Sequence, residues 1–166
     1  MLLTSCYHRR ASRRLKTEFM VQLDGAGSGA EDRIVIMGAT NRPQELDDAV
    51  LRRLVKRVYI PLPDTEARLY LIQRLLKTVP SDPGCEETIA TATDGYSGSD
   101  LAALCREAAW EPIRSLGSAL RDIDEGDVRP VAQSDFEAAM RVIRPSVSPG
   151  DLRGYEEWNK LFGASG

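Results

Sequence analysis

The sequence is poor in the residues that build metal sites, disulfide frameworks and membrane spans. It contains one histidine and three cysteines. His8 has no cysteine or acidic residue at helical spacing, so we expect no metal site. An odd number of cysteines without metal-ligand spacing favours reduced thiols in an intracellular compartment, cytoplasm or nucleus. No run approaches eighteen apolar residues, so we expect no membrane-spanning segment.

A phosphate-binding loop is also absent. No segment has the form G-x-x-x-x-G-K-[ST], whose backbone N–H groups cradle phosphates while its lysine and hydroxyl reach the terminal phosphate and Mg²⁺. Residues 1–10 contain no aspartate or glutamate. The composition, with 28% charged and 42% hydrophobic residues, fits a folded chain of one domain or two small ones. A net charge of −3 gives no overall nucleic-acid signal.

The first part of the chain mixes helices with two short apolar strands. The continuous β-branched run at 34–37 predicts a strand that is buried on both faces. Val58–Ile60 predicts a second strand, which two prolines bring to an end. Asp47 is predicted to cap a short helix whose far end carries Arg52 and Arg53. This order of elements is typical of an α/β domain.

The part after Pro63 predicts helices only. Capping residues and apolar positions at three- and four-residue spacing place helix starts near residues 64, 85, 97, 134 and 148. The sequences at 97–100 and 134–137 fit capping boxes, in which a hydroxyl and a carboxylate satisfy reciprocal backbone donors. Pro112 is predicted to bend or break the helix that begins near residue 97.

Several of these motifs resemble the meiotic clade of AAA ATPases, which includes spastin, katanin and fidgetin. The resemblance runs from about Ala11 to Gly163 and is carried by Ile34–Pro63, Asp94–Leu101, Leu104–Ala109, Arg144–Pro149 and Trp158–Lys160. Within the clade, Val128–Val131, Asp135–Glu137 and Arg144–Pro149 are most similar to the fidgetin-like branch, as is Leu54, where spastin has phenylalanine.

The resemblance implies a fold in two parts. Residues 1–63 would form the carboxyl-terminal part of a P-loop α/β nucleotide domain with parallel sheet strands. Residues 64–166 would form a helical-bundle lid with a carboxyl-terminal helix. The phosphate loop and the acidic strand end that precede Ala11 in the family are absent here. We therefore expect the back portion of an ATPase module, which by itself turns over no ATP.

The resemblance also implies an activity and partners. Relatives hydrolyse ATP with Mg²⁺ in a hexameric ring and remodel a protein threaded through the central pore. The substrates would be microtubules, gripped by the acidic tubulin tails, or recombination filaments on DNA. An alternative is a non-catalytic assembly or regulatory module that joins a ring of full-length subunits. A third reading, a nucleic-acid binder with a basic patch, is disfavoured by the net acidity and the lack of a reading helix.

Three residues carry the implied catalytic roles. Asn41 lies where the family has its sensor-1 asparagine, which hydrogen-bonds the γ-phosphate or its attacking water, although spacing alone fits a turn residue equally well. Arg52 and Arg53 lie at the arginine-finger positions, which complete the neighbouring subunit's site. The alternative for both arginines is a solvated helix end, where the helix dipole favours cations.

Two further pairs are candidates for binding. Gly98 and Ser99 lie in a turn that contacts the nucleotide in the family, and the same turn is sufficiently explained as a capped helix start. Arg9 and Arg10 lie near the second pore loop of the clade, where positive charge would attract an acidic substrate tail. The alternative for these two is a solvated helix start, since basic clusters are unspecific.

Overall fold

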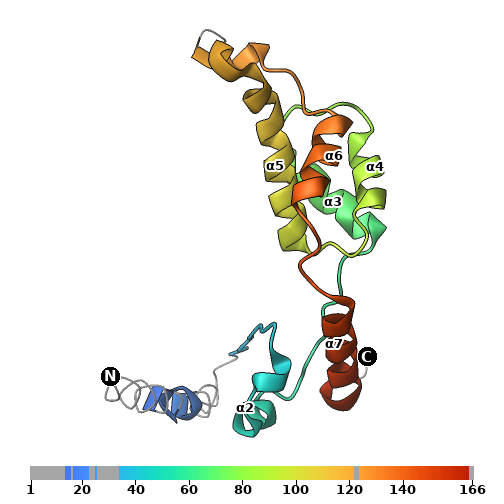
Figure 1. The fold of residues 1–166 in the computed structure, drawn as a ribbon. Helices are drawn as coiled ribbons and strands as arrows, with labels where there is room; N and C mark the ends of the chain where they lie inside the picture. The colour runs from blue at the N-terminus through green and yellow to red at the C-terminus, as the bar shows by residue number, and fades with distance from the viewer. Residues whose placement is uncertain (1–13, 16, 23–24, 26–33, 122–123, 165–166) are drawn as a thin grey trace, which may run out of the picture. The chain divides into compact units, whose positions relative to one another are not determined.

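The structure is a computed structural model that describes residues 14–15, 17–22, 25, 34–121 and 124–164 (Figure 1). The chain divides into two compact units, each with its own internal contacts. The first unit comprises residues 1–59 and 154–166, and the second unit comprises residues 60–153.

The first unit contains the short helix α2, Asp48–Arg53, preceded by the 3₁₀ turn η1, Pro43–Glu45. The carboxylate of Asp47 caps α2 by accepting a hydrogen bond of 2.8 Å from the backbone N–H of Ala49. The predicted cap is therefore confirmed. The cap fixes where α2 begins, and the last turn of α2 carries Arg52 and Arg53.

The two predicted strands are not formed among the described residues. Residues 34–40 and 54–64 have no regular secondary structure, and Val35 and Met37 are 86% and 90% exposed. A strand is completed by hydrogen bonds to a neighbour, and the described part of the first unit offers these segments none. The isolated bridge between Ser81 and Val131 lies in the second unit. The parallel-sheet part of the predicted fold class is thus not confirmed.

The second unit is a helical bundle. Its packed helices lie side by side in Figure 1, where α5 contacts α3 and α6, and α4 contacts α3 and α6. They are α3 (Thr65–Leu75), α4 (Cys85–Ala92), α5 (Gly98–Leu116) and α6 (Gln133–Val142), with 3₁₀ turns η2 (Gly117–Arg121) and η3 (Glu125–Asp127) between α5 and α6. Helix α7, Pro149–Phe162, starts in this unit and continues into the first unit.

The bundle buries a continuous apolar core, as the predicted helical stripes require. Its completely or almost completely buried side chains are Ile72, Ile89, Leu101, Leu104, Val131 and Phe136. Phe136 is 0% exposed and belongs to the cluster that joins α6 to α3, α4 and α5. The second unit therefore has the hydrophobic core that a separate folding unit needs.

The structure corrects two local predictions in this unit. Helix α5 continues past Pro112 to Leu116, so it is not broken there, and the proline ring is fully buried. Helix α6 begins at Gln133, so Ser134 is not its N-cap. The carboxylate of Asp135 instead accepts a hydrogen bond of 2.9 Å from the backbone N–H of Ala132.

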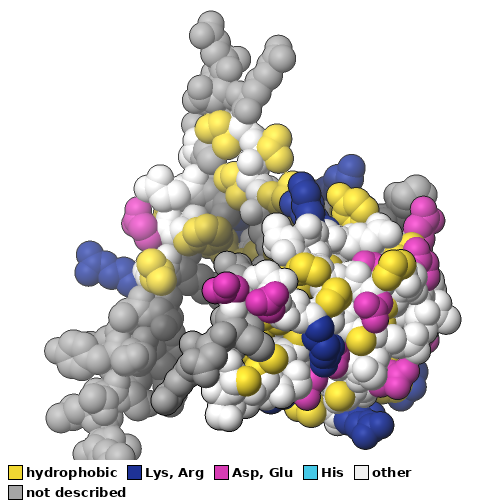
Figure 2. All heavy atoms as spheres, turned by 90° about the horizontal axis from the view of Figure 1, so that it is seen from above, with side chains coloured by type: hydrophobic (Ala, Val, Ile, Leu, Met, Phe, Trp, Pro, Cys, Tyr) yellow, Lys and Arg dark blue, Asp and Glu magenta, His cyan; other side chains and the backbone are white. Residues whose placement is uncertain are grey.

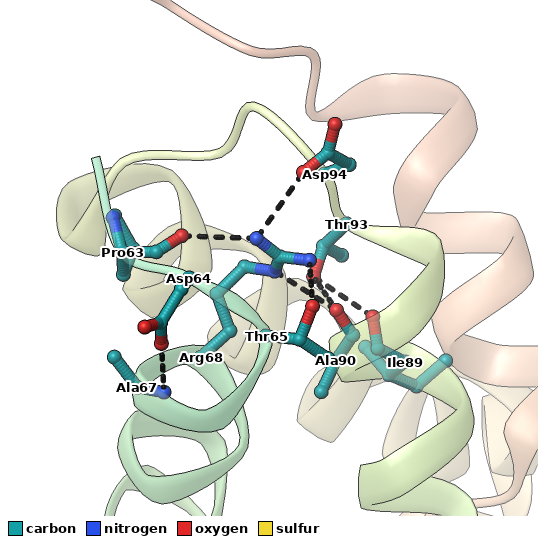
Figure 3. A network of polar contacts seen from close by, with 9 residues as sticks. All are labelled: Pro63, Asp64, Thr65, Ala67, Arg68, Ile89, Ala90, Thr93 and Asp94. Carbon is teal, nitrogen blue, oxygen red and sulfur yellow. Dashed lines mark hydrogen bonds and ion pairs between the residues drawn. The ribbon is translucent and has the colours of Figure 1, made fainter. Parts of the chain in front are cut away.

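A buried arginine holds the start of α3 against the end of α4 (Figure 3). Arg68 is 3% exposed. Its Nε donates to the carbonyl of Ala90 at 2.8 Å, and its Nη1 donates to the carbonyl of Pro63 at 2.9 Å and to the Asp94 carboxylate at 3.3 Å. Its Nη2 donates to the Thr65 hydroxyl at 3.1 Å. The guanidinium thereby satisfies carbonyls at the entrance to α3 and near the end of α4.

Candidate functional site

Asn41 lies in an exposed bend that follows residues 34–40. The Thr40 hydroxyl accepts a hydrogen bond of 3.0 Å from the backbone N–H of Arg42, which shapes this turn. The backbone carbonyl of Asn41 accepts a hydrogen bond of 2.9 Å from the hydroxyl of Tyr155 on α7. The backbone at Asn41 is therefore held from α7, and its carboxamide lies on an exposed residue that can contact a ligand.

The two arginines at the end of α2 differ in their surroundings. Arg52 is exposed, and its guanidinium bonds to none of the described residues. Arg53 is partly buried, and its Nη1 donates to the carbonyl of Ala49 at 3.1 Å on the same helix. Arg53 thus folds back along α2. Arg52 is the one whose positive charge is presented outward.

Gly98 and Ser99 are both exposed and lie in the first turn of α5. A methyl group added at Gly98 would meet Leu71 Cδ1 at 4.0 Å, an ordinary contact, so the described neighbours leave room for a side chain there. The first amides of an α-helix lack intrahelical acceptors, and the helix dipole favours negative charge beside them. This turn has the chemistry to receive polar ligand atoms.

Asp100 fixes the position of that turn. Its Oδ2 accepts hydrogen bonds from the backbone N–H and hydroxyl of Ser97 at 2.9 and 2.8 Å, which confirms the predicted capping box. The same oxygen accepts from the backbone N–H and hydroxyl of Ser146 at 3.2 and 3.1 Å. Burial alone would raise the pKa of Asp100, but these hydrogen bonds outweigh it and hold the pKa below its ordinary value. Asp100 is therefore a charged anchor.

The candidate residues fall into both units. Asn41, Arg52 and Arg53 belong to the first unit, whereas Gly98 and Ser99 belong to the second. Arg9 and Arg10 lie outside the described residues. Sequence reasoning missed Tyr155 and Arg57 as residues near the site. No local spacing could have shown their distant partners.

The described residues hold no metal-ligand cluster and no membrane-spanning helix, and the face in Figure 2 shows no basic patch. In the described ranges, no group of three or more His, Cys, Asp or Glu side chains could hold a metal ion. No helix among these residues is both long and apolar enough to cross a bilayer. On the face in Figure 2, acidic, basic and apolar side chains are interspersed over the described surface. A nucleic-acid binder is expected instead to gather its lysines and arginines into a patch or stripe.

Three protein-family models match parts of the chain, two of them over overlapping ranges. Residues 4–62 match the ATPase family associated with various cellular activities (AAA). Residues 87–138 match the AAA+ lid domain, and residues 114–163 match the Vps4 C-terminal oligomerisation domain. Together with the helical bundle and the order of elements, these matches define the class: the chain is a portion of an AAA module that includes its lid.

Similar proteins indicate which AAA proteins this chain is related to. The chain is 54% identical over 156 residues to fidgetin-like protein 1 of Rattus norvegicus and of Homo sapiens, covering 92% of this chain and 23% of either relative. It is 49% identical over 155 residues to spastin of Dictyostelium discoideum, covering 92% of this chain and 24% of that protein. The chain belongs to the AAA group that contains fidgetin-like protein 1 and spastin, as its motifs predicted.

Solved structures of AAA proteins are similar to this chain in fold and in sequence. The FIGL-1 AAA domain in complex with ADP superposes with a TM-score of 0.87 at 48% identity, over 93% of this chain and 53% of that one. A structure that concerns katanin self-assembly superposes with a TM-score of 0.76 at 36% identity, over 91% of this chain and 54% of that one.

Proposed function

We propose that the chain is the sensor, finger and lid portion of an ATPase that hydrolyses ATP in a ring and remodels protein assemblies, as in the microtubule-severing type. The proposal is supported by the similarity to fidgetin-like protein 1, spastin and the ADP-bound FIGL-1 domain. Ring assembly is supported by the match of residues 114–163 to an oligomerisation domain and by the similarity to self-assembling katanin. Tubulin tails and recombination filaments are the candidate substrates.

The observation that carries the proposal is the exposed guanidinium of Arg52 at the end of α2. An arginine that bonds to none of the described residues is available to a phosphate on another subunit. Its guanidinium is always charged and presents a fork of donors that fits a phosphoryl group. Such an arginine stabilises negative charge that develops during phosphoryl transfer. The exposure of Arg52 favours it over Arg53 for this role.

The other candidate residues have the chemistry to hold a nucleotide. When bound, ATP supplies the phosphoryl group. The carboxamide of Asn41 can donate to a phosphate oxygen or orient a water molecule, and the exposed first turn of α5 at Gly98 and Ser99 can receive polar atoms. The Mg²⁺ that the resemblance implies would be held largely by the phosphates and water, and we assign it no ligand among the described residues.

The cellular compartment remains part of the proposal. Cys85 and Cys105 are free and buried. Free thiols suit a reducing compartment, so we propose the cytoplasm or nucleus.

The test is a chimera in which this chain replaces the 156 aligned residues of human fidgetin-like protein 1. We expect Arg52→Ala to lower kcat by about 10³-fold or more while leaving nucleotide binding nearly unchanged, because the finger acts on the transition state. Arg106→Ala is the matched control, since Arg106 is an exposed arginine on α5 that bonds to none of the described residues. An unchanged kcat in both Arg52→Ala and Arg53→Ala would contradict the proposal.

A further inference from the structure

Helix α7 is hydrogen-bonded to Asn41 and to Arg57, which follows the candidate arginine fingers. The Tyr155 hydroxyl donates to the backbone carbonyl of Asn41 at 2.9 Å. At the carboxyl end of α7, the Nη1 of Arg57 donates to the backbone carbonyl of Phe162 at 2.9 Å. These contacts span 114 and 105 residues of sequence. One helix thus reaches the sensor-1 segment and the segment that follows the arginine fingers.

Arg57 joins the carboxyl ends of two helices. Its Nη1 binds the last residue of α7, and its Nη2 donates to the carbonyl of Leu51, which lies in the last turn of α2 directly before Arg52. The final carbonyls of a helix have no intrahelical donor, so both acceptors need an outside partner. The helix dipole also makes both ends negative, which suits a cation. The backbone carbonyl of Arg57 in turn accepts from Ala164 at 2.9 Å, which closes the contact from the other side.

We propose that Arg57 and Tyr155 are positioning residues through which α7 sets the arginine finger and the sensor-1 backbone. The inference rests on the proposed function, because the orientation of Arg52 and Asn41 matters only if these residues act in catalysis. A carbonyl fixed at Leu51 restricts the rotation of the last turn of α2 and therefore the direction in which Arg52 leaves the helix. Catalytic groups lose rate steeply when they are misplaced by about 1 Å. This is a role for α7 in addition to assembly.

The geometry requires an arginine. The guanidinium is a rigid planar fork that can serve two carbonyls in fixed directions, whereas a lysine ammonium is a point charge on a flexible stem. Arg57→Lys therefore keeps the favourable charge near both helix ends and removes the fixed bridge between them. Likewise, Tyr155→Phe keeps the ring and removes only the hydroxyl that binds Asn41. These two substitutions separate positioning from charge and packing.

The first experiment measures amide hydrogen exchange in the full 166-residue chain. In Arg57→Lys we expect the amides of Arg53, Leu54 and Ala164 to exchange about tenfold faster, as the loss of one or two hydrogen bonds predicts. Helices α3 to α6 should exchange at the wild-type rate. Arg106→Lys and Tyr70→Phe are matched controls on exposed residues of the second unit. Wild-type exchange at all three amides in Arg57→Lys would overturn the proposal.

The second experiment measures turnover in the chimera with human fidgetin-like protein 1. We expect Arg57→Lys to lower kcat by about 10- to 100-fold with little change in KM for ATP, because a misplaced finger affects the transition state more than binding. Tyr155→Phe should lower kcat in the same sense. Arg52→Ala is measured in parallel. If Arg52→Ala abolishes turnover and Arg57→Lys retains the full kcat, the positioning role is wrong. If Arg52→Ala leaves kcat unchanged, Arg52 is not the finger and this inference fails, whereas the proposed function fails only if Arg53→Ala also leaves kcat unchanged.

Discussion

Replacing Arg68 with methionine should destabilise the second unit strongly. The guanidinium is nearly inaccessible and serves two backbone carbonyls, of Pro63 and Ala90. Methionine fills similar apolar space without donating a hydrogen bond. After the substitution, the Ala90 carbonyl retains only the Thr93 hydroxyl at 3.5 Å among the described residues. The substitution therefore leaves the buried Ala90 carbonyl and the partly buried Pro63 carbonyl without good partners.

The magnitude follows from these contacts. Each buried acceptor left without a partner costs about 1–3 kcal/mol. The Asp94 partner is 91% exposed at its side chain, so that ion pair contributes less than about 1 kcal/mol. Removing the buried charge returns part of the loss, because burying an ion is itself costly. The net loss should be about 2–4 kcal/mol. With a urea slope of about 1.5 kcal/mol per molar, the midpoint falls by about 2 M.

The two buried cysteines provide an assay that reports on the second unit alone. Cys85 and Cys105 are 3% and 4% exposed. Burial raises the pKa of the Cys105 thiol to about 12, so it reacts only after the unit opens. Pulsed alkylation along a urea gradient, read by peptide mass spectrometry, gives the midpoint for each thiol. Arg106→Met should stay within about 0.5 kcal/mol of wild type, as expected for an exposed position. A midpoint for Arg68→Met equal to that of Arg106→Met would refute the reasoning.

Two further predictions concern the same unit. The hydrogen-bonded Arg129 guanidinium holds the pKa of Asp135 below its ordinary value of 3.8. The charged carboxylate therefore stabilises the fold above pH 3.8, and this stability is lost as the pH falls through the lower, folded-state pKa. Thermal melts at stepped pH should show the loss, and Asp135→Asn should make the melting temperature depend less on pH in this range. Phe136→Ala removes a fully buried ring and should lower the free energy of unfolding by about 3–5 kcal/mol in the alkylation assay. Trp110→Ala, at a 54% exposed position, should lower it far less. Equal losses in the two variants would contradict the assigned core.

Helix starts could be predicted because their causes are local. The side chains of Asp47, Asp64 and Ser97 each accept a hydrogen bond from a backbone N–H two or three residues later. Such bonds depend on a few adjacent residues, which a sequence displays directly. The apolar stripes of the second unit are local in the same sense. The unbroken helix at Pro112 has the opposite origin, since it depends on core packing around α5.

The strands and the contacts of α7 could not be predicted in this way. The apolar run at 34–37 has strand composition, but a strand also needs a partner, and none is present among the described residues. Tyr155 and Arg57 depend on acceptors more than a hundred residues away. In the sequence, a tyrosine on an apolar helix face has the same pattern whether its hydroxyl hydrogen-bonds to water or to a distant backbone carbonyl. Only the folded chain separates these cases.

Arg52 and Arg53 show what the structure adds to a motif. As neighbours in the sequence they carry the same charge at the same helix end, and either could be the finger or a simple dipole partner. In the folded chain, Arg53 donates to the carbonyl of Ala49, whereas Arg52 is exposed. The carbonyl directly before Arg52 is held by Arg57, which α7 also binds. The position of Arg52 is therefore constrained while its guanidinium is left available, and this combination is what a group that acts on a neighbouring subunit requires.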